Sequence, residues 1–231
     1  MEELSLLQRV AIWVLPVLFA ITVHETAHGW MALRLGDPTA KMLGRLTLNP
    51  IKHIDPLGTV IVPGLMLMFS GFLFGWAKPV PVTAQNLRNP RGDMAWVALA
   101  GPLSNLLMAI FWALVARIGM LLGDVSPELA LFLIYSGVAG IFVNTLIGVL
   151  NLLPILPLDG GRILSALLPG RVAYQLDRLE PYGLIILVVL LFTGILGMIL
   201  WPLIGLVLQG LAPLGGFSVD ALAYLLHTLR N

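Results

Sequence analysis

Apolar residues make up most of the chain, and polar, turn-rich segments divide them into long stretches. Three stretches, residues 94–122, 129–153 and 182–208, are long enough to cross a bilayer as single helices, which takes about 20 residues. In the last of these we expect a kink at Pro202, because a proline inside a helix removes a backbone hydrogen bond. A fourth stretch, residues 10–33, has a similar length. The pattern predicts an all-α polytopic membrane protein.

Three further segments are harder to assign. Residues 57–77 are apolar but interrupted by glycines and a proline, so they either cross the membrane or re-enter it as a hairpin. Residues 212–231 are weakly amphipathic and either lie in the interface or form a short last span. Residues 36–55 are polar and rich in turn formers, and we expect one or two short strands there, as a small cytoplasmic β-hairpin region. The chain is thus expected to form one domain, residues 1–231, with about five to six transmembrane or re-entrant segments.

Composition agrees with a lipid environment. Hydrophobic residues are 58% of the 231 and charged residues 11%, against roughly 45–50% and about 25% in a soluble domain. The 13 Lys and Arg nearly balance the 12 Asp and Glu, so no overall field favours nucleic acid as a partner. Because the chain has 0 cysteines, a metal ion would have to be bound by His, Asp or Glu.

The positions of the basic residues predict the orientation. If residues 57–77 crossed the membrane, the two most basic loops would lie on opposite faces, contrary to the positive-inside rule. A re-entrant hairpin removes that conflict. We therefore expect the N-terminus outside, and the first, second and fourth loops in the cytoplasm. Their basic residues are Arg34, Lys41, Arg45 and Lys52, then Lys78, Arg88 and Arg91, then Arg162, Arg171 and Arg178.

Residues 10–33 contain the motif His24-Glu25-Thr26-Ala27-His28, which matches H-E-x-x-H. In a helix, the four-residue spacing places both imidazoles on one face, so that they can share one metal ion. Glu25 can then reach a water on that ion without being a ligand. The alternative is a pair of core histidines beside an incidental glutamate. Ionisable groups within a lipid-facing stretch are costly unless they perform a task, which favours the metal site.

Asp159 is the candidate for the third ligand that a zinc site needs. Prolines at 154 and 157 loosen the helix that precedes it, and the pair Gly160-Gly161 lets the backbone bend so that the carboxylate can approach an ion. Taken alone, Asp159 could equally cap a cytoplasmic helix that begins near Arg162. The incomplete histidine site elsewhere in the chain favours the ligand.

These two motifs, in this order and both in membrane segments, resemble the site-two protease family of intramembrane zinc metalloproteases. The stretch that contains Leu87-Arg88-Asn89-Pro90-Arg91 and Ala100-Gly101-Pro102-Leu103-Ser104-Asn105 is similar to the family's lead into its central helix. No PDZ domain fits between the motifs and no CBS pair follows them, so we expect a compact, prokaryotic type of member.

The resemblance implies the roles of individual residues. His24, His28 and Asp159 would bind one Zn2+, and Glu25 would be the catalytic general base. Asn151 would lie near the site, where its amide supports the substrate or the developing oxyanion. The implied substrate is a transmembrane segment of another protein, cleaved at a site that opens towards the cytoplasmic side of the cell membrane. An extended substrate could pair with a strand edge in residues 36–55 or 79–83.

Two other functions compete with proteolysis. A polytopic transporter could use the His and Asp pair to coordinate a permeating metal ion, but the sequence has no inverted repeat and transport needs no carboxylate beside the first histidine. A pseudoprotease would bind membrane helices without cutting them, which the complete motif disfavours.

Asn105 and Asn144 lie within apolar stretches and need partners there. Hydrogen bonding between helices is the simpler expectation, and support of the metal site is the alternative.

Overall fold

The computed structural model describes residues 4–56, 58 and 77–230, and the elements assigned in this part of the chain are all helices. Its helices include 4 that are long and apolar enough to cross a membrane, which agrees with the predicted polytopic membrane protein. They are α1 (Leu6–Arg34), α4 (Pro90–Leu121), α5 (Pro127–Asn151) and α9 (Ile195–Gly215). Apart from its residues 58 and 77, the segment predicted to be re-entrant, 57–77, lies outside the described residues.

Shorter helices connect and flank these four. They are α2 (Thr39–Met42), α6 (Asp159–Leu167), α7 (Gly170–Asp177), α8 (Gly183–Phe192), α10 (Val219–Arg230) and the 3-10 helices η1 (Pro50–His53), η3 (Ala84–Asn86) and η4 (Glu180–Tyr182). The segment predicted over residues 212–231 is thus divided between the end of α9 and the separate helix α10.

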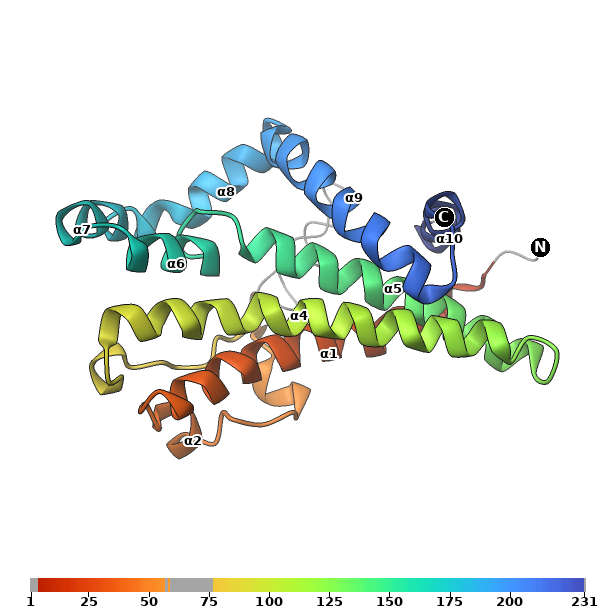
Figure 1. Ribbon diagram of the computed structural model, residues 1–231, viewed down its shortest axis with the longest axis horizontal. Helices are drawn as coiled ribbons and strands as arrows, with labels where there is room; N and C mark the ends of the chain where they lie inside the picture. Colours follow the sequence, from red (N-terminus) through yellow and green to blue (C-terminus); the bar gives the residue numbers. More distant parts are fainter. Residues whose placement is uncertain (1–3, 57, 59–76, 231) are drawn as a thin grey trace.

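Helices α4 and α5 pack closely along their length and form the centre of the bundle (Figure 1). Small residues make the close approach possible: a Cβ added at Gly140 would lie 2.6 Å from Trp112 Cδ1, and one at Gly137 would lie 2.7 Å from Ala116 N. Packing of this kind takes the place of a hydrophobic driving force between helices in lipid. Helix α1 packs against both α4 and α5, so the motif helix is held by the central pair.

The predicted span over residues 182–208 is two helices, which are divided at residues 193–194. Helix α8 ends at Phe192, and α9 begins at Ile195 and continues through Pro202. The break falls at Gly194, whose φ of 76° is a left-handed conformation that glycine adopts without a Cβ clash. The preceding Thr193 turns its hydroxyl back to the Val189 carbonyl. Local backbone chemistry at this pair therefore divides the predicted span, and Pro202 lies within α9.

Residues 36–55 contain the helices α2 and η1, and no strand is assigned to any described residue of this loop, where we expected one or two. The backbone groups of the loop are satisfied in other ways. The Thr47 carbonyl accepts hydrogen bonds from the Thr26 hydroxyl of α1 and from His53 Nε2, and Arg45 N–H donates to the Ala40 carbonyl. These bonds to turns and side chains tie the loop to α1 without a partner strand.

The three basic loops lie at the same end of the bundle. Figure 1 shows α2, the approach to α4, and α6 with α7 at one end, whereas the turn between α4 and α5 lies at the other. Helix α5 ends part of the way along α4, and α6 packs against α4 beyond that point. A cavity lined by residues of α1, α4 and α6 and by Asn151, the last residue of α5, lies at this point.

Asp37 fastens the loop after α1 to the segment that leads into α4. Its side chain is fully buried (0% exposed), Oδ1 accepts from Thr39 N–H and from Asn86 Nδ2 at 3.0 Å each, and Oδ2 accepts from Thr83 N–H at 2.7 Å. The Thr39 hydroxyl also donates to it. Burial alone would raise the pKa of Asp37, but these hydrogen bonds hold its pKa below the usual value.

We expect Asp37→Asn to lower the free energy of unfolding by about 1–3 kcal/mol at neutral pH. The asparagine NH2 group would face either the Thr83 N–H or the Thr39 and Asn86 donors, so that two donors meet without an acceptor. A carboxylate with a lowered folded pKa stabilises above its unfolded pKa, about 3.9, and that stabilisation is lost as the pH falls through the lower folded value. Thermal unfolding in detergent should therefore separate the two proteins at pH 7 and much less at strongly acidic pH. Asp124→Asn, an exposed acid at the other end, is the control; equal melting temperatures for Asp37→Asn and wild type at pH 7 would refute this role.

Candidate active site

The two histidines of the motif lie one turn apart on the face of α1 that packs against α4. Their Nε2 atoms are 3.0 Å apart. His28 Nδ1 lies 2.7 Å from the Val97 carbonyl oxygen, and His24 Nδ1 lies 2.6 Å from Asn105 Oδ1. Because a carbonyl oxygen only accepts, His28 carries its proton on Nδ1, and in the neutral ring Nε2 keeps a free lone pair. The spacing predicted from the sequence is thus realised, with both Nε2 atoms directed to the same point.

Asp159 joins the histidines from the first residue of α6. Its Oδ2 lies 3.3 Å from His24 Nε2 and 3.4 Å from His28 Nε2. The helix begins at Asp159 itself and not near Arg162, so the alternative of a cap for a later helix does not describe this residue. A Cβ at Gly161 would lie 2.5 Å from Leu156 N, and neither Gly160 nor Gly161 has a positive φ. The glycine pair therefore serves close packing of α6 on the preceding turn, where we had expected a backbone bend.

The three atoms fit a tetrahedral metal ion. With bonds of about 2.0–2.1 Å to the metal, neighbouring ligand atoms in a tetrahedron are about 3.3 Å apart. The observed separations are 3.0, 3.3 and 3.4 Å. Asp159 Oδ2 is buried and has no hydrogen-bond partner among the described residues. A cation satisfies all three, and of the residues that the structure describes only His24, His28 and Asp159 form such a group.

Glu25 points into the same cavity from the adjacent position on α1. The cavity has a volume of about 310 Å3 and is lined by the three candidate ligands together with Glu25, Asn151, Pro79, Val80, Val82 and Arg162. Glu25 Oε2 accepts a hydrogen bond from Val80 N–H at 2.7 Å. This bond brings the extended segment before η3 to the edge of the site.

Asn151 is the last residue of α5 and also lines this cavity. Its Nδ2 donates to the Ile147 carbonyl, one turn earlier, at 3.0 Å. The structure therefore brings all five sequence-predicted site residues, His24, Glu25, His28, Asn151 and Asp159, around one cavity.

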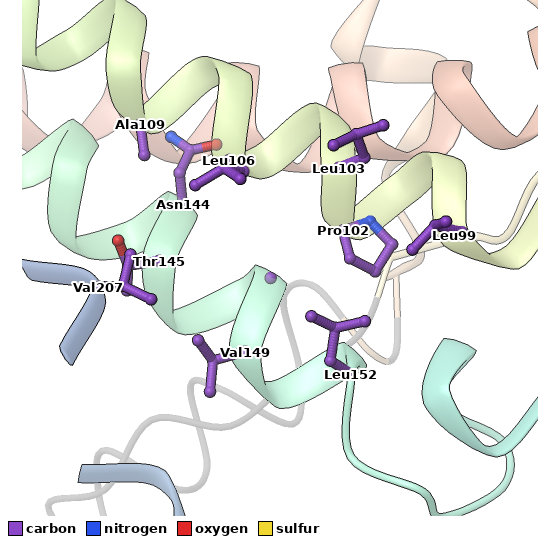
Figure 2. Close-up of a pocket in the computed structure, with 11 residues that line it drawn as sticks. Leu99, Pro102, Leu103, Leu106, Ala109, Asn144, Thr145, Val149, Leu152 and Val207 are labelled. Carbon is purple, nitrogen blue, oxygen red and sulfur yellow. The ribbon is translucent and has the colours of Figure 1, made fainter. Parts of the chain in front are cut away.

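A second cavity lies beside the first and is almost wholly apolar. Figure 2 shows side chains from α4 and α5 around it, among them Pro102, Leu106, Val149 and Leu152, with Val207 of α9 at one side. Its volume is about 270 Å3. None of the predicted site residues lines it, so the cavity that carries the ionisable groups is the candidate active site.

Gly101 is a part of the site that the sequence did not identify as functional. A Cβ at this position would lie 2.5 Å from His28 Cε1 and 2.6 Å from His24 Cε1, so only glycine lets α4 pass this close to both rings. Val97 and Val80 were also missed, because they act through backbone groups. The signal for Gly101 was its place beside Pro102 in the middle of an apolar helix.

We expect Gly101→Ala to lower kcat/KM for a membrane substrate by about 100-fold, because a ligand displaced by about 1 Å can cost that much. The matched control is Gly210→Ala in α9, where no described atom lies within 4 Å of the added Cβ. Both variants should fold, as judged by thermal unfolding in detergent. Wild-type activity in a folded Gly101→Ala protein would show that the rings do not need this close wall.

The chain is similar in sequence to one protein family and to several known proteins. Residues 118–194 match the model of Peptidase family M50. The chain is 40% identical over 196 residues to YwhC of Bacillus subtilis, covering 83% of this chain and 84% of that protein. It is 33% identical over 178 residues to Rip2 of Mycolicibacterium smegmatis, covering 76% of this chain and 64% of that protein. It is 30% identical over 190 residues to Rip2 of Mycobacterium tuberculosis H37Rv, covering 80% and 70%.

All three relatives carry zinc metalloprotease in their names, and no solved structure matches the chain. Paired histidines and an aspartate that meet between apolar helices, next to a glutamate that is not one of the three ligand candidates, define a membrane-embedded metallopeptidase. The similarity to YwhC extends this conclusion over most of both chains. The protein belongs to Peptidase family M50, and the predicted resemblance to site-two proteases is confirmed. The comparisons give no support to a metal-ion transporter.

Proposed function

We propose that this protein is a zinc-dependent intramembrane endopeptidase that hydrolyses peptide bonds in or near the transmembrane segments of other membrane proteins. The observation that carries the proposal is the convergence of three ligand atoms at 3.0–3.4 Å beside Glu25 in one cavity. Two imidazole nitrogens and one carboxylate oxygen suit zinc and leave its fourth position open, and the names of the relatives support the same ion.

Each residue of the cavity has a proposed role. His24, His28 and Asp159 hold the zinc ion, which when bound acidifies water and polarises the carbonyl of the scissile peptide. Glu25 accepts the proton from the attacking water and donates it to the amide nitrogen as the C–N bond breaks. The Asn151 amide, of which one N–H is held by Ile147, has its second N–H for the substrate or the developing oxyanion.

The substrate must reach the cavity in an extended form, because a helix hides its carbonyls in intrahelical hydrogen bonds. Of the two docking segments considered from the sequence, residues 79–83 are better supported, since Pro79, Val80 and Val82 line the cavity. Pro79 and Pro81 have no N–H, and the Val80 N–H donates to Glu25, so Val82 is the residue whose N–H strand pairing would use. If Val82→Pro left cleavage unchanged, strand pairing through this segment would be abandoned.

The proposed orientation places the active site towards the cytoplasm of a cell in whose membrane the protein lies. It is supported by the three basic loops that share one end of the bundle (Figure 1), because such loops stay in the cytoplasm. The N-terminus then lies outside. Because the chain has 0 cysteines, single-cysteine variants at Arg45 and Asp124 can be labelled with an impermeant reagent. If the reagent labelled the Arg45 variant from outside intact cells, the loop that contains this residue would lie outside, and the true orientation would be the reverse of the proposed one.

The direct test of function uses the purified protein in liposomes with a single-span protein substrate that carries a tag at each end and Gly or Pro near the centre of its helix. We expect two fragments, whose new ends lie in or near the transmembrane segment by mass spectrometry. Cleavage confined to exposed loops far from the membrane would contradict intramembrane proteolysis. Zinc flux without cleavage would contradict proteolysis altogether.

A further inference from the structure

We infer that Asn105 and Asn144 form a directional chain of amide hydrogen bonds that fixes the tautomer of His24, and so sets how tightly the site binds its metal ion. The inference rests on the proposed metal site but concerns two residues outside it. Asn105 lies in α4 and Asn144 in α5, and both side chains are fully buried (0% exposed) in the apolar centre of the bundle.

The direction of the chain is set at its far end by backbone carbonyls. Asn144 Nδ2 lies 2.9 Å from the Gly140 carbonyl oxygen, which only accepts, so this end of the amide is the NH2 group. Asn144 Oδ1 is therefore the atom that faces Asn105, and it accepts from Asn105 Nδ2 at 3.0 Å. Asn105 Nδ2 also donates to the Ala20 carbonyl at 3.2 Å. Two acceptors thus hold the NH2 group of Asn105 away from the metal site.

The orientation of the Asn105 amide determines which ring nitrogen of His24 carries the proton. With its NH2 group engaged, Asn105 presents Oδ1 to His24 Nδ1 at 2.6 Å, and an amide oxygen can only accept. The proton of the neutral ring is therefore on Nδ1, and Nε2 keeps the lone pair that faces His28 and Asp159. A reversed Asn105 amide would place a donor against Nδ1 and move the ring proton to Nε2, where it would block a metal ion.

The two histidines reach the same state by different means. His28 donates to the Val97 carbonyl, a backbone group that cannot turn round. His24 has a side-chain amide in that position, so its tautomer depends on whatever orients the amide. Hydrogen bonding of the second ring nitrogen is what orients metal-binding histidines generally. Here the orienting group extends over two helices, because Asn144 of α5 fixes Asn105 of α4.

A role in holding helices together would also explain two buried asparagines, and it makes a different prediction. Helix association needs only that the amides bond to each other. The proposed role requires the acceptor end of the chain at His24, and its loss should change the metal site even when the fold is intact. Asn105 and Asn144 are therefore positioning residues, which act on the metal through His24.

The test compares Asn105→Leu and Asn144→Leu with Thr145→Val. Thr145 is adjacent to Asn144, and its buried hydroxyl has no hydrogen-bond partner among the described residues, so its near-isosteric replacement is a matched control. Zinc affinity is measured by competition with a chromogenic chelator. We expect Asn105→Leu to bind zinc about 10–100-fold more weakly, Asn144→Leu to lose less because Ala20 still holds the amide, and Thr145→Val to match wild type.

The tautomer is read separately in metal-free protein with 15N-labelled histidine, which is practical because the chain has only 4 histidines. The His24 ring should be protonated on Nδ1 in wild type and in Thr145→Val, and should gain an Nε2-protonated population in Asn105→Leu. Wild-type zinc affinity and an unchanged ring in folded Asn105→Leu would overturn the inference. If Asn105→Leu does not fold, wild-type affinity and ring state in Asn144→Leu overturn it. Failure of wild type to bind zinc would instead contradict the proposed function, whereas the ring spectra would still test the amide chain.

Discussion

Glu25→Gln is expected to lower kcat/KM for a membrane substrate by about 10²–10⁴-fold, the usual contribution of a general base, while the zinc content stays at the wild-type level. Glutamine keeps the shape of the side chain, and its amide oxygen can still accept the Val80 N–H, but it cannot take a proton from water. The three candidate ligands do not include Glu25. Initial cleavage rates in proteoliposomes and elemental analysis of the same preparation measure the two quantities.

The control for this change is Glu128→Gln, which alters an exposed glutamate in the first turn of α5. It should cleave at the wild-type rate. Cleavage that survives in Glu25→Gln would refute the role of Glu25 as base. Zinc lost together with cleavage would instead make Glu25 a part of the metal site.

Asp159→Asn is expected to release the metal ion as well as to abolish cleavage. The substitution removes the negative charge and can place an NH2 group opposite the two Nε2 atoms, at 3.3 and 3.4 Å. Since changing only a group that orients a ligand typically weakens metal binding about 10–100-fold, losing a ligand should weaken it by more than about 100-fold. Competition with a chelator measures the affinity.

Asp177→Asn is the matched control, because this exposed aspartate of α7 accepts a hydrogen bond from Ser165 far from the ligand atoms. Its zinc affinity should equal that of wild type. An Asp159→Asn protein that binds zinc as tightly as wild type would remove Asp159 from the ligand set, whatever happens to cleavage.

The long helices and the histidine pair were predictable because they depend on short-range patterns. A stretch of about 20 apolar residues is enough to identify a span, and the four-residue spacing of His24 and His28 fixes their common face. Asp159 was reached by chemistry and resemblance, since no periodicity relates a residue to another that lies more than a hundred positions earlier. Its place beside both rings depends on how α6 packs on α4.

The remaining features depend on tertiary contacts that the sequence pattern does not encode. The division of the span over residues 182–208 at Gly194 follows from a backbone conformation, and the loop of residues 36–55, where we expected strands, is held by hydrogen bonds to α1. Around the metal site, Val97 and Val80 act through a carbonyl and an N–H that every residue possesses. Asn105 was recognisable as a buried polar residue, but its contact with His24 required the packing of α1 on α4.

The central claim is that one zinc ion held by His24, His28 and Asp159 is required for cleavage. The most direct measurement titrates wild-type protein in liposomes with a zinc chelator and follows zinc content and cleavage rate in the same samples. We predict that cleavage falls in proportion to the zinc removed, from about one ion per chain, and returns when zinc is restored. Cleavage that continues after the zinc has been removed would contradict the account.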